Sequence, residues 1–189
     1  MDTIVAKITN DSLTDKKIYE QAGKILREGG LVAFPTETVY GLGADALDEE
    51  ASAKIYAAKG RPSDNPLIVH IADIEALYKL SCEVPDKALK LADKFWPGPL
   101  TMILKKSDIV PDSITGGLGT VAIRMPSHKV AAELIRTSGV YIAAPSANTS
   151  GKPSPTRASH VIKDLSGKID MIIEDDTVDI GVESTIIRS

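Results

Sequence analysis

The feature of this sequence that most restricts its fold is the alternation of short, fully apolar runs with segments of helical periodicity. The runs LVAF (31–34) and VYIAA (140–144) lack the polar–apolar alternation of a strand with one solvated face. Strands of this kind are buried on both sides, which requires helices above and below the sheet. The pattern therefore predicts an α/β protein.

The positions of the expected elements follow from the same two periodicities. Apolar runs predict strands at 3–8, 31–34, 66–71, 100–105, 120–124, 140–144, 169–173 and 184–188. Helical spacing predicts helices from residue 12 to the Gly29-Gly30 pair, over about 49–58, 73–80 and 85–95, around 130–135, and over about 156–163. Ser12 and Asp15 resemble a capping box, and Thr156 is expected to cap the helix that follows it.

The expected sheet is mixed. Runs 100–105 and 120–124 have no helix between them, so we expect them to pair antiparallel, whereas a parallel pair needs a long crossover connection. We therefore expect residues 1–189 to form a single domain with a twisted, open sheet of parallel and antiparallel strands, flanked by helices.

Length, charge and cysteine content exclude several classes of protein. The chain has 189 residues, which suits one domain with a sizeable core. Its formal net charge is −4, whereas proteins that wrap nucleic acid are usually basic. The single cysteine, Cys82, excludes an internal disulfide framework and fits a reducing compartment. Apolar runs are too short to span a bilayer and the N-terminus does not resemble a signal peptide, so we expect a cytoplasmic protein with no membrane partner.

Residues 35–46 (PTETVYGLGADA) contain Gly41, Gly43 and Ala46, which formally match the dinucleotide fingerprint G-x-G-x-x-A. That fingerprint places its first glycine at the end of a strand, but Gly41 comes well after the expected strand 31–34. We therefore interpret the two glycines as part of a turn. The preceding PTET supplies hydroxyls and a carboxylate, so a ligand-binding loop and a polar turn with a helix cap are both open.

Two segments place cations next to expected strand ends. In KGRPSDNPLIVHI (59–71), Lys59 and Arg61 can together meet a phosphate chain, although cations at a helix end also complement the helix dipole. Arg124 ends the apolar run TVAIR, so its guanidinium is expected at the sheet's edge. There it could hold a ligand carboxylate or pair with a structural acid such as Glu183.

The three histidines give little chemical signal. His70 stands in an apolar strand, where a buried structural histidine is commoner than a site residue. His128 and His160 fall in helical surface patterns. No spacing of histidine, cysteine and carboxylate residues indicates a zinc site.

Residues 143–156 (AAPSANTSGKPSPT) resemble either a linker or a damaged phosphate loop. The G-K-P-S at 151–154 is not a Walker A motif, because that motif leads into a helix and here proline follows Lys152. Three prolines and a preceding strand also argue against a slack linker. Hydroxyls and backbone N–H groups on a stiff loop suit a phosphate or adenine site, although composition alone leaves the choice even.

Taken together, the motifs resemble those of threonylcarbamoyl-AMP synthases, the YrdC-like domain. The motifs PTETVYGLG, KGRPSDNPLIVHI, FWPGPLT, VAIRMP, APSANTSGKPSPT and GVEST occur here in that family's order, from about residue 15 to the last residue. The resemblance implies a concave α/β sheet with a central groove. It implies condensation of L-threonine, bicarbonate and ATP into threonylcarbamoyl-AMP and pyrophosphate, for threonylcarbamoyladenosine modification of tRNA.

The resemblance also implies site residues and partners. By motif position the ATP-binding residues are Lys59, Arg61, Ser63, Thr120, Ser146, Asn148 and Ser154, and the L-threonine-binding residues are Thr36, His70, Arg124 and Ser184. No side-chain nucleophile is implied. Mg²⁺ is expected with ATP, and Glu37 is a weak candidate to orient that metal or a water. Downstream, a transferase machinery would use the product on tRNA, and weak binding to tRNA itself stays open.

One departure and two rivals accompany the resemblance. Family members normally continue past S-T-I-[IV] through a further strand, so the family's C-terminal segment is expected to be missing from this chain. Hydrogenase-maturation carbamoyltransferases carry a related domain together with zinc-finger cysteines, which a single cysteine does not match. A non-catalytic RNA-binding module using the same groove is the alternative function, and the net acidity argues against it.

Overall fold

The computed structural model describes residues 2–175 and 178–188. In this part of the chain, strands form one mixed sheet in the order β1-β8-β2-β3-β7-β4-β6-β5-β9. The strands are β1 (Ile4–Lys7), β2 (Val32–Phe34), β3 (Gly41–Asp45), β4 (Ile68–His70), β5 (Leu100–Lys105), β6 (Thr120–Arg124), β7 (Ile142–Ala143), β8 (Met171–Glu174) and β9 (Thr185–Arg188). β5 and β6 pair antiparallel, as predicted, while β4 pairs parallel to β6 and β5 parallel to β9. The predicted mixed α/β sheet is confirmed.

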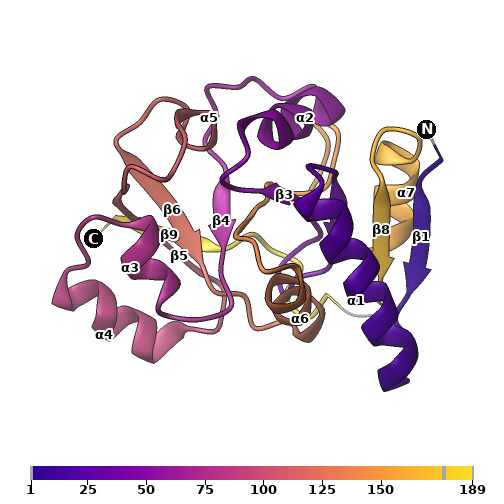
Figure 1. Ribbon diagram of the computed structural model, residues 1–189, viewed down its shortest axis with the longest axis horizontal. Coiled ribbons are helices and arrows are strands. Elements are labelled where there is room, and N and C mark those ends of the chain that lie inside the picture. The colour runs from indigo at the N-terminus through magenta and orange to yellow at the C-terminus, as the bar shows by residue number, and fades with distance from the viewer. Residues whose placement is uncertain (1, 176–177, 189) are drawn as a thin grey trace.

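Helices cover both faces of this sheet (Figure 1). They are α1 (Ser12–Arg27), α2 (Glu49–Lys59), α3 (Ala76–Leu80), α4 (Asp86–Phe95), α5 (Asp112–Thr115), α6 (Lys129–Ser138) and α7 (Ala158–Leu165). α1 packs against α6 beside the strands of one half (Figure 1). α5 is the one described helix that the sequence reading missed, because a four-residue helix is too short to show periodicity.

Both predicted caps were wrong in detail. α1 is capped by Asp11, whose carboxylate accepts from the Thr14 backbone N–H, while Asp15 turns back to accept from the Thr9 and Asn10 backbone. Before α7 the N-cap position is occupied by Arg157, which makes no side-chain capping bond.

Apolar strands inside the sheet, such as β2, β7 and β8, are buried on both faces, as their sequences predicted, whereas the edge strands β1 and β9 are largely exposed. Val32 and Phe34 pack into the cluster that includes α1 and α6 side chains, whereas Ala33 between them belongs to the cluster on the other face. In β8, Met171 and Ile173 face the first cluster and Ile172 the second. Side chains of consecutive strand residues point to opposite faces, so one short apolar run serves two cores.

The prediction of a turn at Gly41 and Gly43 was wrong, because both lie in strand β3, between β2 and β7. A β-carbon on Gly43 would stand 2.6 Å from Ile142 Cγ2 and 2.8 Å from Phe34 Cε1. Glycine is therefore needed here for a close approach inside the sheet and not for a turn.

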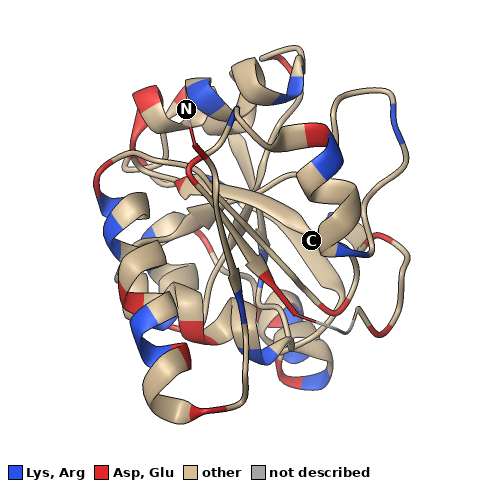
Figure 2. Cartoon of the chain, turned by 90° about the vertical axis from the view of Figure 1, so that its right-hand side faces the viewer, with Lys and Arg blue, Asp and Glu red and all other residues tan. Residues whose placement is uncertain are grey.

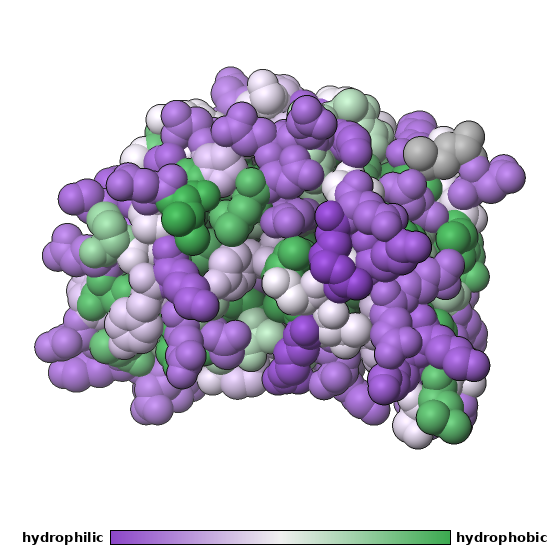
Figure 3. All heavy atoms as spheres, in the orientation of Figure 1, coloured by the Kyte–Doolittle hydropathy of each residue, from purple (hydrophilic) through white to green (hydrophobic). Residues whose placement is uncertain are grey.

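Charges of both signs are spread over the side of the molecule drawn in Figure 2. Lys and Arg alternate with Asp and Glu over the side seen in Figure 2. In Figure 3 hydrophilic residues cover most of the face, with hydrophobic ones in separate small patches. No helix of the described residues is long and apolar enough to cross a membrane.

Candidate active site

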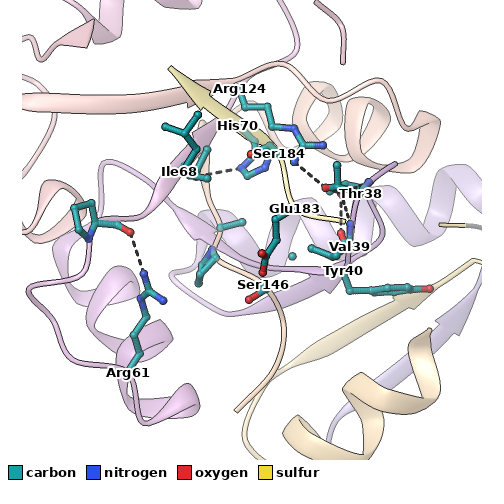
Figure 4. Close-up of a pocket in the computed structure, with 16 residues that line it drawn as sticks. Thr38, Val39, Tyr40, Arg61, Ile68, His70, Arg124, Ser146, Glu183 and Ser184 are labelled. Atoms are coloured by element: carbon teal, nitrogen blue, oxygen red, sulfur yellow. Dashed lines mark hydrogen bonds between the residues drawn. The ribbon is translucent and has the colours of Figure 1, made fainter. Parts of the chain in front are cut away.

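A pocket of about 270 Å³ opens where several strands of the sheet end (Figure 4). Its walls come from the loop after β2, the ends of β4 and β6, the loop after β7, and the segment that leads into β9. The lining residues that can bind a polar ligand are Thr36, Thr38, Arg61, His70, Arg124, Ser146, Glu183 and Ser184.

All four residues that the sequence assigned to threonine line this pocket: Thr36, His70, Arg124 and Ser184. They come from four separate segments, which the fold brings together. His70 and Arg124 are neighbours because β4 pairs with β6 in that register. The Ser184 hydroxyl lies 2.7 Å from that of Thr101 on β5, which fixes the start of β9 beside the pocket.

Two residues of the PTET loop (35–38) hold the Arg124 guanidinium. Its Nη2 atom lies 2.7 Å from Glu37 Oε1, and its Nη1 atom donates to Thr38 Oγ1 at 2.9 Å. Of the two alternatives left open for Arg124, pairing with an acid is present in the structure, but the acid is Glu37 and not Glu183. Burial is the largest single influence and raises the pKa of the Glu37 carboxyl. The Arg124 charge, the hydrogen bond to Arg124 and backbone hydrogen bonds together outweigh burial, so the pKa lies below its ordinary value. Glu37 is thus an ionised, buried partner of arginine.

Thr36 forms part of a polar turn and also lines the pocket, whereas the helix cap considered for PTET was wrong. Its hydroxyl donates to the Val39 carbonyl at 2.7 Å and lies 2.9 Å from the Thr38 hydroxyl, which closes a polar turn. The same residue also lines the pocket. The turn leads into strand β3 and not into a helix.

His70 is neutral in this environment. Burial first, and the nearby Arg124 charge second, lower the pKa of His70 to about 3. Its Nδ1 atom donates to the Ile68 carbonyl at 3.1 Å. Arginine therefore supplies the positive charge on this side of the pocket, and histidine supplies a neutral polar ring.

The residues assigned to ATP divide into two groups. Arg61 and Ser146 line the pocket. Arg61 Nη2 donates to the Pro66 carbonyl at 3.3 Å, which leaves other guanidinium N–H groups for a ligand. Ser154 does not line the pocket itself, but its hydroxyl donates to Glu183 Oε1 at 2.5 Å. Ser63 and Thr120, exposed and half-buried respectively, are not among the lining residues.

Lys59 is placed differently from its predicted role of facing a phosphate chain. Its side chain is buried, and its ammonium donates to the backbone carbonyls of Ser146 and Asn148. Burial, with a smaller effect of the Arg61 charge, lowers the pKa of Lys59 to about 8. The structure thus shows Lys59 as an internal anchor of the loop after β7.

That loop is ordered by its own polar groups, so the alternative of a linker was wrong. Asn148 is buried; its Oδ1 accepts from Ser146 Oγ at 2.6 Å, and its Nδ2 donates to the Lys152 carbonyl at 2.8 Å. The Lys152 ammonium in turn lies 2.7 Å from Asp164 on α7. The loop also hydrogen-bonds to the backbone of Tyr40, directly before β3, and of Leu42 within β3. It is a rigid wall of the pocket.

The sequence did not assign Glu183 to a ligand, and it placed His128 wrongly. Glu183 contributes a carboxylate to the pocket, and its position directly before Ser184 in GVEST was the available signal. The expectation of a surface His128 was wrong: the residue is buried and caps α6, its Nδ1 accepting from the Val130 N–H at 3.2 Å.

Comparisons with known proteins concern the chain as a whole. The family model Sua5_yciO_yrdC, described as telomere recombination, matches residues 24–189. The chain is 58% identical to the threonylcarbamoyl-AMP synthase of Pyrococcus abyssi over 98% of its own length and 54% of that protein. It is 57% identical to the threonylcarbamoyl-AMP synthase of Bacillus subtilis, over 95% of this chain and 52% of the relative.

Solved structures give the same result. The structure of P. abyssi Sua5 in complex with L-threonine matches with a TM-score of 0.94 and 56% identity, over 100% of this chain and 54% of that one. Escherichia coli YciO matches with a TM-score of 0.82 at 24% identity, over 100% of this chain and 91% of that chain, which supports the fold alone. The present chain spans about half the length of the P. abyssi and B. subtilis relatives.

Proposed function

Because the chain belongs to the Sua5_yciO_yrdC family, we propose that it carries the active site of a threonylcarbamoyl-AMP synthase. This site would condense L-threonine, bicarbonate and ATP into threonylcarbamoyl-AMP and pyrophosphate, a nucleotidyl transfer. The observation that carries the proposal is the convergence of Thr36, His70, Arg124 and Ser184 on one pocket that also contains Arg61. Support comes from relatives named for this activity and from the threonine complex of P. abyssi Sua5.

The charges of the pocket suit the substrates. Arg124, fixed by Glu37 and Thr38, would present its free guanidinium edge to the threonine carboxylate. Arg61, which lines the same pocket as Ser146, would meet the phosphates. Two cations in one pocket can hold two anions close together, which an uncatalysed reaction in water cannot do.

The reaction needs positioning more than a protein nucleophile. The threonine ammonium would first lose a proton to solvent; the free amine then adds to carbon dioxide formed from bicarbonate and loses a second proton, which gives a carbamate. A carbamate oxygen then attacks the α-phosphorus, and pyrophosphate leaves. The protein's contribution would be to place the two substrates, neutralise charge at the phosphates and keep water from the labile carbamate.

Mg²⁺ would enter with the nucleotide. The described residues contain no group of three His, Cys, Asp or Glu side chains that could hold a metal ion, and Glu37 is paired with Arg124. Mg²⁺ at nucleotide sites is commonly held largely by phosphate oxygens and waters, so the nucleotide itself would supply most of its ligands. When bound, the ion would neutralise phosphate charge.

The test is pyrophosphate release from ATP, Mg²⁺ and bicarbonate with each amino acid in turn. Threonine and bicarbonate should both be required. Serine should be a poorer substrate, because one methyl group in a pocket contributes about 1–3 kcal/mol. Equal release without any amino acid would exclude the proposal. The product would serve a downstream machinery that modifies tRNA, and addition of that machinery with tRNA tests this step separately.

A further inference from the structure

We propose that Glu183 binds the α-ammonium group of the amino-acid substrate and so restricts the pocket to α-amino acids. The inference rests on the proposed function, because it takes threonine as the ligand. Glu183 is the one carboxylate among the described residues that line the pocket. It lies directly before Ser184, and in Figure 4 its side chain extends from the backbone beside Ser184 toward Ser146.

The charge pattern of the pocket leads to this assignment. Arg124 and Arg61 provide two positive charges, one for a carboxylate and one for phosphates. An amino acid also brings an ammonium group, which needs an acceptor. Glu37 cannot serve, since it is buried behind Arg124 and paired with it. His70 is a neutral ring whose Nδ1 already donates to the Ile68 carbonyl. Glu183 is the remaining charged acceptor.

One oxygen of the Glu183 carboxylate is held by the protein, and the other is available to a ligand. Its Oε1 accepts from Ser154 Oγ at 2.5 Å, and within the described residues no hydrogen bond or ion pair engages Oε2. Ser154 belongs to the loop assigned to the nucleotide, whereas Ser184 belongs to the residues assigned to threonine. An ammonium on Oε2 would therefore stand at the boundary between the two substrates, where the nitrogen must be carboxylated before attack on the α-phosphorus.

The experiment combines one substitution with one change of ligand. Binding of L-threonine and of (R)-3-hydroxybutyrate, which is threonine without its amine, is measured by calorimetry on the wild-type chain and on Glu183→Gln. Glutamine keeps an oxygen for Ser154 and removes only the charge. We expect Glu183→Gln to weaken threonine binding roughly tenfold to a hundredfold. Binding of 3-hydroxybutyrate should change by less than about twofold, because that ligand has no ammonium.

Two further variants separate this role from a structural one. Glu75→Gln removes an exposed carboxylate that is not part of the pocket, and should leave both ligands unaffected. Ser154→Ala removes the bond to Glu183 but keeps the carboxylate, so it should weaken threonine much less than Glu183→Gln does.

The outcomes are distinct. Equal weakening of both ligands in Glu183→Gln would overturn the assignment while leaving the proposed function intact. A wild-type chain that binds neither ligand and releases no pyrophosphate with threonine would overturn both. A loss for threonine alone supports the assignment.

Discussion

Arg124 Nη2 lies 2.7 Å from Glu37 Oε1, and both side chains are buried. The pair joins the end of β6 to the loop after β2, so the same contact stabilises the fold and aims the guanidinium into the pocket. Removing one member of a buried ion pair leaves the other charge uncompensated, which costs about 3–5 kcal/mol.

Glu37→Gln should therefore lower the free energy of unfolding by roughly 3 kcal/mol, and the melting temperature by roughly 10 °C. The matched control is Glu133→Gln, since Glu133 and Arg136 form an exposed pair at 2.8 Å. Exposed pairs contribute less than about 1 kcal/mol, so the control should unfold nearly as the wild type does. Urea unfolding of the three proteins decides; equal stability of the two variants would show that the buried pair is not a stabilising contact.

The buried His70 should make stability depend on pH. Its pKa is lowered from 6.5 to about 3, so between these values the unfolded chain binds a proton that the folded chain does not. Stability should then decrease as the pH falls below about 6.5, with a slope approaching 1.4 kcal/mol per pH unit near pH 5. In His70→Gln, the free energy of unfolding should depend less on pH, because this titrating group is absent.

Unfolding in urea at several pH values between about 4.5 and 7 measures the effect. His160→Gln, at an exposed position of α7, is the control and should keep the wild-type slope. Parallel slopes for wild type and His70→Gln would mean that His70 titrates alike in both states.

The sequence was sufficient to predict a mixed sheet, but it did not predict every strand of that sheet. The runs at β2, β5, β6 and β8 are apolar enough to be recognised, and their burial on both faces followed from that. β3 was missed because GLGAD has neither an apolar run nor an alternating pattern, and its place is fixed by neighbours on both sides. Only tertiary packing shows that its glycines admit Phe34 and Ile142.

For the site, motif position identified the residues but not their partners. Thr36, His70, Arg124 and Ser184 were grouped by resemblance, and the fold does bring them together. Glu37 and Arg124 are 87 positions apart in the sequence. They meet only because the loop after β2 contacts the end of β6. No local pattern encodes such a contact.

The close approach at Gly43 gives a prediction about the sheet. Gly43→Ala would place a methyl group 2.6 Å from Ile142 Cγ2, in a fully buried position. Overpacking of this kind costs about 1–3 kcal/mol. Gly119→Ala is the control, because an added β-carbon there meets nothing within 4 Å. Thermal unfolding should show a clear loss for Gly43→Ala alone, and a wild-type melting temperature for that variant would contradict the packing.

The last prediction separates the two cations of the KGR segment, which the sequence had assigned one role. Arg61 lines the pocket, so Arg61→Gln should weaken ATP binding roughly tenfold to a hundredfold, with little change in melting temperature.

Lys59 is instead buried, and its ammonium holds the carbonyls of Ser146 and Asn148. Lys59→Met would leave both carbonyls without this donor, at a cost of about 1–3 kcal/mol for each buried unsatisfied group. We therefore expect Lys59→Met to melt at a lower temperature and to lose ATP binding because the loop after β7 loosens. Calorimetry and thermal unfolding of both variants distinguish the roles. If Lys59→Met kept the wild-type melting temperature and lost only ATP, Lys59 would be a direct phosphate contact and not an anchor.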